Sequence, residues 1–145
     1  MEVRFKKINV RAEPPTRETV GSAGYDLRAI TDSPVRILPG ETVMLHTGIA
    51  VEIPKGIFGA VFARSGMAAK RGLRPANAVG VIDSDYRNEI MVALHNDSSD
   101  EQVIYDGDRI AQLVFLPFLA FDFVESQELS GTMRGLGGFG STGVF

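Results

Sequence analysis

The sequence predicts a single all-β domain, built as a sandwich or barrel of short strands. Apolar or alternating runs recur along the chain, turn-forming residues separate them about every 8 to 12 residues, and one short segment alone has a helical pattern. With 145 residues, 44% of them hydrophobic, the chain is long enough for one domain to bury its own core. We therefore expect an all-β fold with one short helix.

Strands are expected where Val, Ile, Leu and Phe gather, because these residues suit a pleated, half-buried surface. Proline and glycine at positions 39–40 and 54–56 end two of the runs. The helix is expected at residues 65–70, which include good helix formers. In chain order, the expected strands are residues 8–10, 25–30, 35–38, 42–46, 49–53, 57–62, 78–82, 89–94, 103–105, 109–115 and 120–124.

The charge and cysteine content exclude several classes of function. The chain has 15 Lys and Arg against 18 Asp and Glu, a net charge of −3, so it lacks the basic surplus that stable nucleic-acid or anionic-membrane binding needs. The lack of cysteine excludes thiol catalysis, disulfide frameworks and cysteine-ligated zinc. No apolar leader opens the sequence and no stretch approaches the about 18 apolar residues of a membrane span, so we expect a soluble, cytoplasmic protein without a signal peptide.

A glycine-rich segment near the C-terminus is the first candidate site. Six of the 16 glycines lie between Gly131 and Gly143, and Gly135, Gly137 and Gly140 match the spacing G-x-G-x-x-G. That spacing binds dinucleotides only between a strand and a helix, and here the chain ends five residues later. Such glycines still let backbone N–H groups approach phosphate oxygens closely. The alternative is a flexible Gly- and Ser-rich tail with no site.

Side chains embedded in this segment favour a nucleotide-binding role. Arg134 offers charged donors, and Ser141 and Thr142 offer hydroxyl donors. Phe139 offers a flat apolar face on which a base can stack. An arginine and a phenylalanine at fixed places among the glycines are not what an unstructured tail requires.

The second candidate is segment 80–90, which contains Asp83, Asp85 and Tyr86. A strand leads into the carboxylates, an Arg-Asn pair makes a turn and another strand follows, so we expect a hairpin with acidic groups at its mouth. A carboxylate placed there can act as a general base on water. The alternative is that both aspartates are solvent-exposed turn residues.

Three further signals are weaker when each is taken alone. Arg64, Ser65 and Gly66 stand where a strand gives way to the short helix, which suits an anion site or simply a surface arginine beside a capping serine. Gln112 interrupts an otherwise apolar strand, as edge-strand polar residues often do. Asp26 is an acid early in a strand.

Taken together and in this order, the five segments resemble the homotrimeric deoxyuridine triphosphatase (dUTPase) family along essentially the whole chain. The matching segments are residues 23–27, 64–66, 77–86, 107–112 and 134–143. The resemblance implies a jelly-roll-like β-barrel and a homotrimer with composite active sites at its interfaces. It divides the single domain, residues 1–145, into a barrel body, 1–124, and a flexible Gly-rich C-terminal arm, 125–145, that closes over a neighbouring subunit's site.

The resemblance also implies a reaction, the hydrolysis of dUTP to dUMP and pyrophosphate, which limits uracil in DNA and supplies dUMP. Asp83 would activate a water molecule for in-line attack on the α-phosphorus. Asp26 would reach a Mg²⁺ cofactor through water. The residues that would contact the phosphates, from the barrel and from the arm, are Arg64, Ser65, Gly66, Gln112, Arg134, Gly140, Ser141 and Thr142.

By the same resemblance, Asn77 and the backbone near Gly80 and Ile82 would select uracil. Tyr86 would pack on the deoxyribose and reject UTP, and Phe139 would stack on the base. Two alternatives stay open: a relative of the dCTP deaminases that shares the fold, and a regulatory paralogue that binds deoxynucleotides without turnover. The acidic run at residues 82–86 favours the hydrolase.

Overall fold

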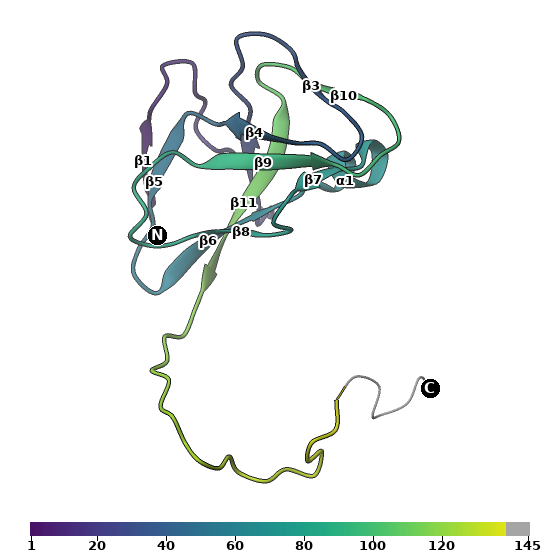
Figure 1. The fold of residues 1–145 in the computed structure, drawn as a ribbon. Helices are drawn as coiled ribbons and strands as arrows, with labels where there is room; N and C mark the ends of the chain where they lie inside the picture. The colour runs from purple at the N-terminus through teal and green to yellow at the C-terminus, as the bar shows by residue number, and fades with distance from the viewer. Residues whose placement is uncertain (139–145) are drawn as a thin grey trace.

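The computed structural model describes residues 1–138, which form eleven strands and one short helix (Figure 1). The prediction of an all-β fold with a single helix is confirmed. In chain order the elements are β1 (Arg4–Lys7), β2 (Tyr25–Arg28), β3 (Val35–Ile37), β4 (Thr42–His46), β5 (Ile49–Glu52), β6 (Ile57–Phe62), α1 (Ser65–Arg71), β7 (Leu73–Pro75), β8 (Gly80–Ile82), β9 (Met91–Asn96), β10 (Gln102–Ile104) and β11 (Arg109–Pro117).

The strands form open antiparallel sheets in a jelly-roll-like arrangement. The largest sheet has the order β2-β11-β6-β8, and a second sheet has the order β4-β9-β7. Two-stranded pairs, β1 with β5 and β3 with β10, complete the body. In Figure 1, β9 runs across β11 at a steep angle, and β6 and β8 lie below β4 and β9, so the two larger sheets lie in separate layers.

The core lies between these layers and draws on every sheet. Leu27 of β2, Leu94 of β9 and Leu113 of β11 are fully buried and belong to one apolar cluster. Strand β9 shows the alternation expected of a half-buried strand, with Val92, Leu94 and Asn96 inward. The buried amide of Asn96 is satisfied because its Nδ2 donates to the carbonyl oxygens of Ile37 and Asp100.

The helix α1 sits where the sequence predicts it and ends at a glycine. Gly72 adopts a left-handed conformation, φ 64°, and its N–H bonds to the Ala68 carbonyl. A side chain at position 72 would lie 2.9 Å from the backbone nitrogen of Ser98. The chain therefore turns sharply where the helix ends. At the other end of the helix, Arg64 is the N-cap residue.

Several strand predictions are wrong. Residues 8–10 form a turn, in which the N–H groups of Ile8 and Asn9 both bond to the Gly48 carbonyl. The preceding residues form β1, which pairs with β5. Residues 120–124 are exposed and pair with no described strand, although they have the composition of one. Strand β7 was not predicted, since it is only three residues long and ends in proline.

The predicted hairpin at residues 80–90 is also wrong. Strand β8 pairs with β6 in the four-stranded sheet, whereas β9 pairs with β4 and β7 in the other. The acidic loop between them therefore passes from one sheet to the other. A turn signal shows that the chain reverses direction, but not which strands pair on either side.

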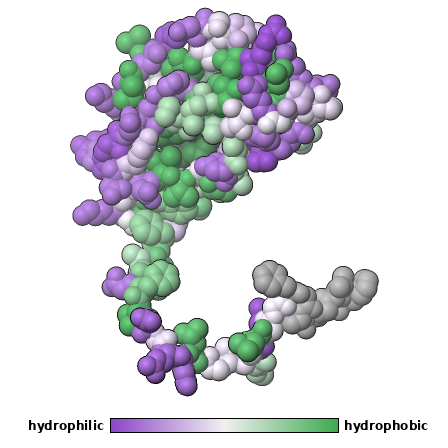
Figure 2. Space-filling view, viewed as in Figure 1, coloured by the Kyte–Doolittle hydropathy of each residue, from purple (hydrophilic) through white to green (hydrophobic). Residues whose placement is uncertain are grey.

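Beyond β11, residues 118–138 run away from the body as an extended arm (Figure 1). Apolar side chains recur along it, among them Phe121, Phe123 and Leu129, each at least 76% exposed. Figure 2 shows apolar surface both on the arm and on the part of the body from which it leaves. Among the described residues, no helix is long and apolar enough to cross a membrane.

Candidate nucleotide-binding site

The largest sheet brings together the predicted metal residue, Asp26, and two predicted phosphate contacts, Arg64 and Gln112. Asp26 of β2 lies opposite Gln112 of β11, which in turn lies opposite Phe62 of β6. Arg64 follows Phe62 by two residues, and its Nε donates to Asp26 Oδ1 at 2.7 Å. The cross-strand register therefore gathers residues that are far apart in the sequence.

Asp26 is the hub of this cluster, and its side chain is only 12% exposed. Its second oxygen, Oδ2, accepts a bond from Nη1 of Arg109 at 3.1 Å, and the same nitrogen contacts Glu18 at 3.0 Å. Two guanidinium groups thus share one nearly buried carboxylate. Of the three guanidinium nitrogens of Arg64, only Nε donates a hydrogen bond to a partner within residues 1–138. The two terminal nitrogens can therefore reach a ligand.

Gln112 is held in place by a hydrogen bond and by a close backbone approach. Its Nε2 donates to the Ala63 carbonyl at 2.9 Å. A Cβ at Gly24 would lie 2.3 Å from Gln112 Oε1, so only glycine leaves room for this side chain. Ser65 and Gly66 follow on the exposed first turn of α1. These side chains and backbone groups form one polar, partly buried patch beside Asp26.

The predicted base contacts lie together at the other edge of the sheet. Asn77, Gly80 and Ile82 line one hollow of about 170 Å³, whose wall also includes Val61 and Met91. The loop before it is tight: Val79 N–H bonds to the Asn77 carbonyl at 2.6 Å. Ala78 between them has a positive φ of 60°, which is uncommon for a residue other than glycine.

Asp83 and Tyr86 lie on the loop that follows β8, and both are exposed. The Tyr86 N–H bonds to the Asp83 carbonyl at 3.1 Å, which closes the turn. The Tyr86 hydroxyl donates to the Glu89 carbonyl at 2.8 Å. Nη1 of Arg87 donates to the carbonyls of Ser84 and Tyr86 and stiffens the loop from within. The carboxylate of Asp83 is therefore presented to solvent from a well-bonded turn.

The phosphate cluster and the base cluster do not meet within one chain. Asp26 lies on β2 and Gly80 on β8, at opposite edges of the four-stranded sheet. Three strand spacings separate these edges, a distance of about 14 Å. Within one chain the phosphate cluster and the base cluster are therefore two separate groups of residues.

Of the predicted arm contacts, Arg134 falls within the described residues. Arg134 is exposed on the extended arm, in a turn where its carbonyl accepts the Gly137 N–H at 3.1 Å. Phe139, Gly140, Ser141 and Thr142, the remaining predicted contacts, lie outside the described residues.

Arg109 contacts the predicted metal residue, Asp26, and sequence reasoning did not anticipate this contact. It belongs to segment 107–112, where the sequence points only to Gln112. A register shift between Arg109 and Ala111 interrupts the pairing of β11 with β2, and such irregularities turn a side chain in a direction that simple alternation does not indicate. The structural signal is its bond to Asp26.

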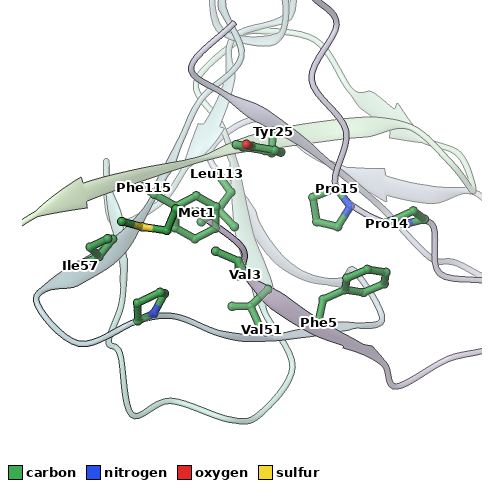
Figure 3. Close-up of a pocket in the computed structure, with 11 residues that line it drawn as sticks. Met1, Val3, Phe5, Pro14, Pro15, Tyr25, Val51, Ile57, Leu113 and Phe115 are labelled. Atoms are coloured by element: carbon green, nitrogen blue, oxygen red, sulfur yellow. The ribbon is translucent and has the colours of Figure 1, made fainter. Parts of the chain in front are cut away.

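A larger cavity of about 330 Å³ lies elsewhere, between the N-terminal strand and the four-stranded sheet. Figure 3 shows its lining as almost wholly apolar, with Met1, Val3 and Phe5 facing Tyr25 and Phe115. The rings of Tyr25 and Phe115 meet edge to face at 5.7 Å. Among residues 1–138, no predicted site residue lines this cavity.

Comparisons with known proteins show the family of the chain. A family model described as dUTPase matches residues 11–143. The chain is 55% identical over 145 residues to the deoxyuridine 5'-triphosphate nucleotidohydrolase of Desulfitobacterium hafniense, across 99% of this chain and 96% of that relative. It is 46% identical over 144 residues to the protein of the same name from Hydrogenobaculum sp., across 99% of each.

Solved structures give the same result. The dUTPase of Staphylococcus bacteriophage 80alpha, with dUPNHPP, is similar at a TM-score of 0.88 and 28% identity, across 99% of both chains. The family match covers nearly the whole sequence, and the relatives are similar from end to end. The chain therefore belongs to the dUTPase family and is an enzyme that hydrolyses deoxyuridine triphosphate.

Proposed function

We propose that the chain converts dUTP to dUMP and pyrophosphate by attack of water on the α-phosphorus. The observation that carries this proposal is the position of Asp83, exposed on a bonded turn directly after the strand that lines the base-sized hollow. From there its carboxylate can accept a proton from water as the water attacks, while pyrophosphate leaves on the opposite side.

The other polar residues position the triphosphate. Arg64 and Gln112 would contact phosphate oxygens from the barrel, and the first-turn groups of Ser65 and Gly66 would add donors. Asp26 holds Arg64 at 2.7 Å, so the guanidinium is oriented before the substrate arrives. Arg134 and the glycine-rich segment after it would close over the terminal phosphates and exclude water.

A Mg²⁺ cofactor fits this donor set. No group of three His, Asp or Glu side chains within residues 1–138 could hold an ion alone, which suits a metal that arrives with the triphosphate. Each oxygen of Asp26 accepts one arginine N–H and keeps a lone pair for a metal-bound water. The ion would supply neutralisation of phosphate charge.

We further propose a homotrimer whose active sites are shared between subunits. Within one chain the phosphate cluster and the base cluster, here called half-sites, lie at opposite edges of one sheet, about 14 Å apart. A neighbouring subunit would bring unlike half-sites face to face. The arm exposes Phe121 and Phe123 to solvent, and aromatic side chains in that state are typical of a segment that packs on a partner. Residues 125–145 would then cover a neighbouring subunit's site.

Selection of the nucleotide follows from the base hollow. At about 170 Å³ it is smaller than the roughly 300 Å³ or more of a pocket for a whole ligand. It would therefore receive the uracil ring alone, with Asn77 and the β8 backbone bonded to its polar edge. Tyr86 would pack on the deoxyribose and Phe139 on the base. The 80alpha enzyme with dUPNHPP supports dUTP as the ligand. We place this activity in the cytoplasm.

The test is pyrophosphate release from dUTP, dCTP, dTTP and UTP with Mg²⁺, for the wild type and for Asp83→Asn. We expect dUTP alone to be turned over, and the variant to lose at least about a hundredfold in kcat. Asp85→Asn is the matched control, because it removes the same charge from the same loop and should retain turnover. Equal activity in Asp83→Asn and Asp85→Asn would refute the assignment of the base.

A further inference from the structure

Glu89 is not among the predicted site residues, yet it bonds to both the loop before it and the body of the fold. Its carboxylate is only 14% exposed. Oε1 accepts the Gly48 N–H at 2.7 Å, and Oε2 lies 2.9 Å from His46 Nδ1. His46 is the last residue of β4, and Gly48 lies in the connection from β4 to β5. One side chain therefore ties the end of the acidic loop to the barrel.

The barrel side of this contact is rigid. Gly48 has a φ of 67°, and a Cβ there would lie 2.5 Å from Ile30 Cδ1. Glycine is therefore the residue that fits this backbone conformation and this space. Its carbonyl also accepts the Ile8 N–H at 2.7 Å. The next residue, Ile49, accepts the Ile90 N–H at 2.8 Å. Glu89 thus binds to a fixed point on the barrel.

The loop side of the contact leads to Tyr86. The backbone carbonyl of Glu89 accepts the Tyr86 hydroxyl at 2.8 Å, so the orientation of the phenol depends on where the Glu89 backbone is held. The Glu89 N–H is bonded to Asn88 Oδ1 at 2.8 Å. The path from the barrel to the tyrosine ring is therefore a short series of hydrogen bonds through one residue.

We propose that Glu89 is a positioning residue for sugar selection. Its carboxylate holds the Tyr86 ring in the position, against the sugar, that leaves no room for a ribose 2′-hydroxyl. This inference rests on the proposed function, in which Tyr86 packs on the deoxyribose. A ring free to tilt would admit UTP more readily and would hold dUTP less firmly. Loss of the Glu89 carboxylate should change the preference for dUTP over UTP, because these two substrates differ only where the Tyr86 ring packs.

The test compares kcat/KM for dUTP and UTP in the wild type, Glu89→Ala and Glu89→Gln. We expect the dUTP-to-UTP ratio to fall about tenfold in Glu89→Ala, as for one lost charge-assisted hydrogen bond. Glu89→Gln keeps an acceptor for the Gly48 N–H and should recover part of the ratio. Glu52→Ala is the matched control: it removes another ion-paired glutamate, bonded to Arg4, and should leave the ratio unchanged.

A merely structural role gives a different result. A variant that only lowers the folded fraction reduces turnover of both substrates equally and keeps their ratio. Tyr86→Phe should lower the ratio as Glu89→Ala does, and the double variant should lose no more than either single one, because both remove the same link. If Glu89→Ala does not fold, Glu89→Gln alone should still show a fall of about threefold.

The outcomes separate the two proposals. A wild-type enzyme that prefers dUTP, with an unchanged ratio in the Glu89 variants, would overturn the positioning role and leave the proposed function intact. Additive losses in the double variant would do the same. A wild-type enzyme that hydrolyses dUTP and UTP equally would overturn both.

Discussion

Gly24 should be essential because of the side chain that lies against it. An alanine Cβ at position 24 would lie 2.3 Å from Oε1, 3.1 Å from Cδ and 3.3 Å from Cβ of Gln112. Gly24 is not among the glycines with positive φ, so alanine suits the backbone and the clash is the whole perturbation. In Gly24→Ala the Gln112 amide has to swing away from the Ala63 carbonyl that it now contacts at 2.9 Å.

The cost divides into stability and activity. The lost hydrogen bond and the forced rotamer together should lower the free energy of unfolding by about 1 to 2 kcal/mol. Displacement of the Gln112 amide from the phosphates should lower kcat/KM for dUTP by about 10- to 100-fold, since misplacement of a positioning group by about 1 Å has effects of that size. Urea unfolding measures the first quantity, and pyrophosphate release measures the second.

Two controls make this result interpretable. Gly21→Ala adds the same methyl group where nothing lies within 4 Å, and it should change neither quantity. In a Gln112→Ala background the obstacle is gone, so adding Gly24→Ala should cost little further stability. Wild-type kcat/KM in Gly24→Ala would refute the claim that Gly24 positions Gln112.

Two further predictions concern the protein surface and the arm. The hydrogen bond from Arg74, more than any other cause, holds the pKa of the Asp97 carboxyl below its ordinary value of 3.8. The ionised carboxylate therefore stabilises the folded state above pH 3.8. This stabilisation is lost as the pH falls through the lower pKa of the folded state. In Arg74→Ala, the Asp97 pKa measured by NMR titration should rise toward 3.8, and an unmoved pKa would contradict the assignment. Deletion of residues 134–145 should leave a folded trimer by light scattering and abolish most dUTP turnover; full turnover in the truncated protein would show that the arm is dispensable.

Much of the barrel was predictable because its strands follow simple local rules. Strands β4 and β6 were predicted with their observed bounds, since each is a run of apolar residues between turn formers. Strand β1 was not, because Arg4, Lys6 and Lys7 give it a polar composition and only pairing with β5 makes it a strand. Residues 120–124 show the opposite case: their composition is that of a strand, but no described strand of the same chain pairs with them.

The site was predictable as a set of residues but not as a geometry. The motifs named Asp26, Arg64 and Gln112, and the structure brings these three together through strand register. Sequence spacing could not reveal that Asp83 lies at the other edge of the sheet, because that depends on which strand β8 pairs with. The contact of Arg109 with Asp26 lies beside a register irregularity, which leaves no mark in the sequence.

The shared site can be tested most directly by mixing two inactive variants. Arg64→Ala disables the phosphate half-site, Asp83→Asn removes the proposed general base beside the base half-site, and each variant alone should be nearly inactive. If the halves come from different subunits, co-refolding the two variants in equal amounts should restore about a quarter of wild-type dUTP turnover, since half of the chains supply an intact Asp83 and half an intact Arg64 at each interface. Mixed trimers that stay inactive would contradict the composite site.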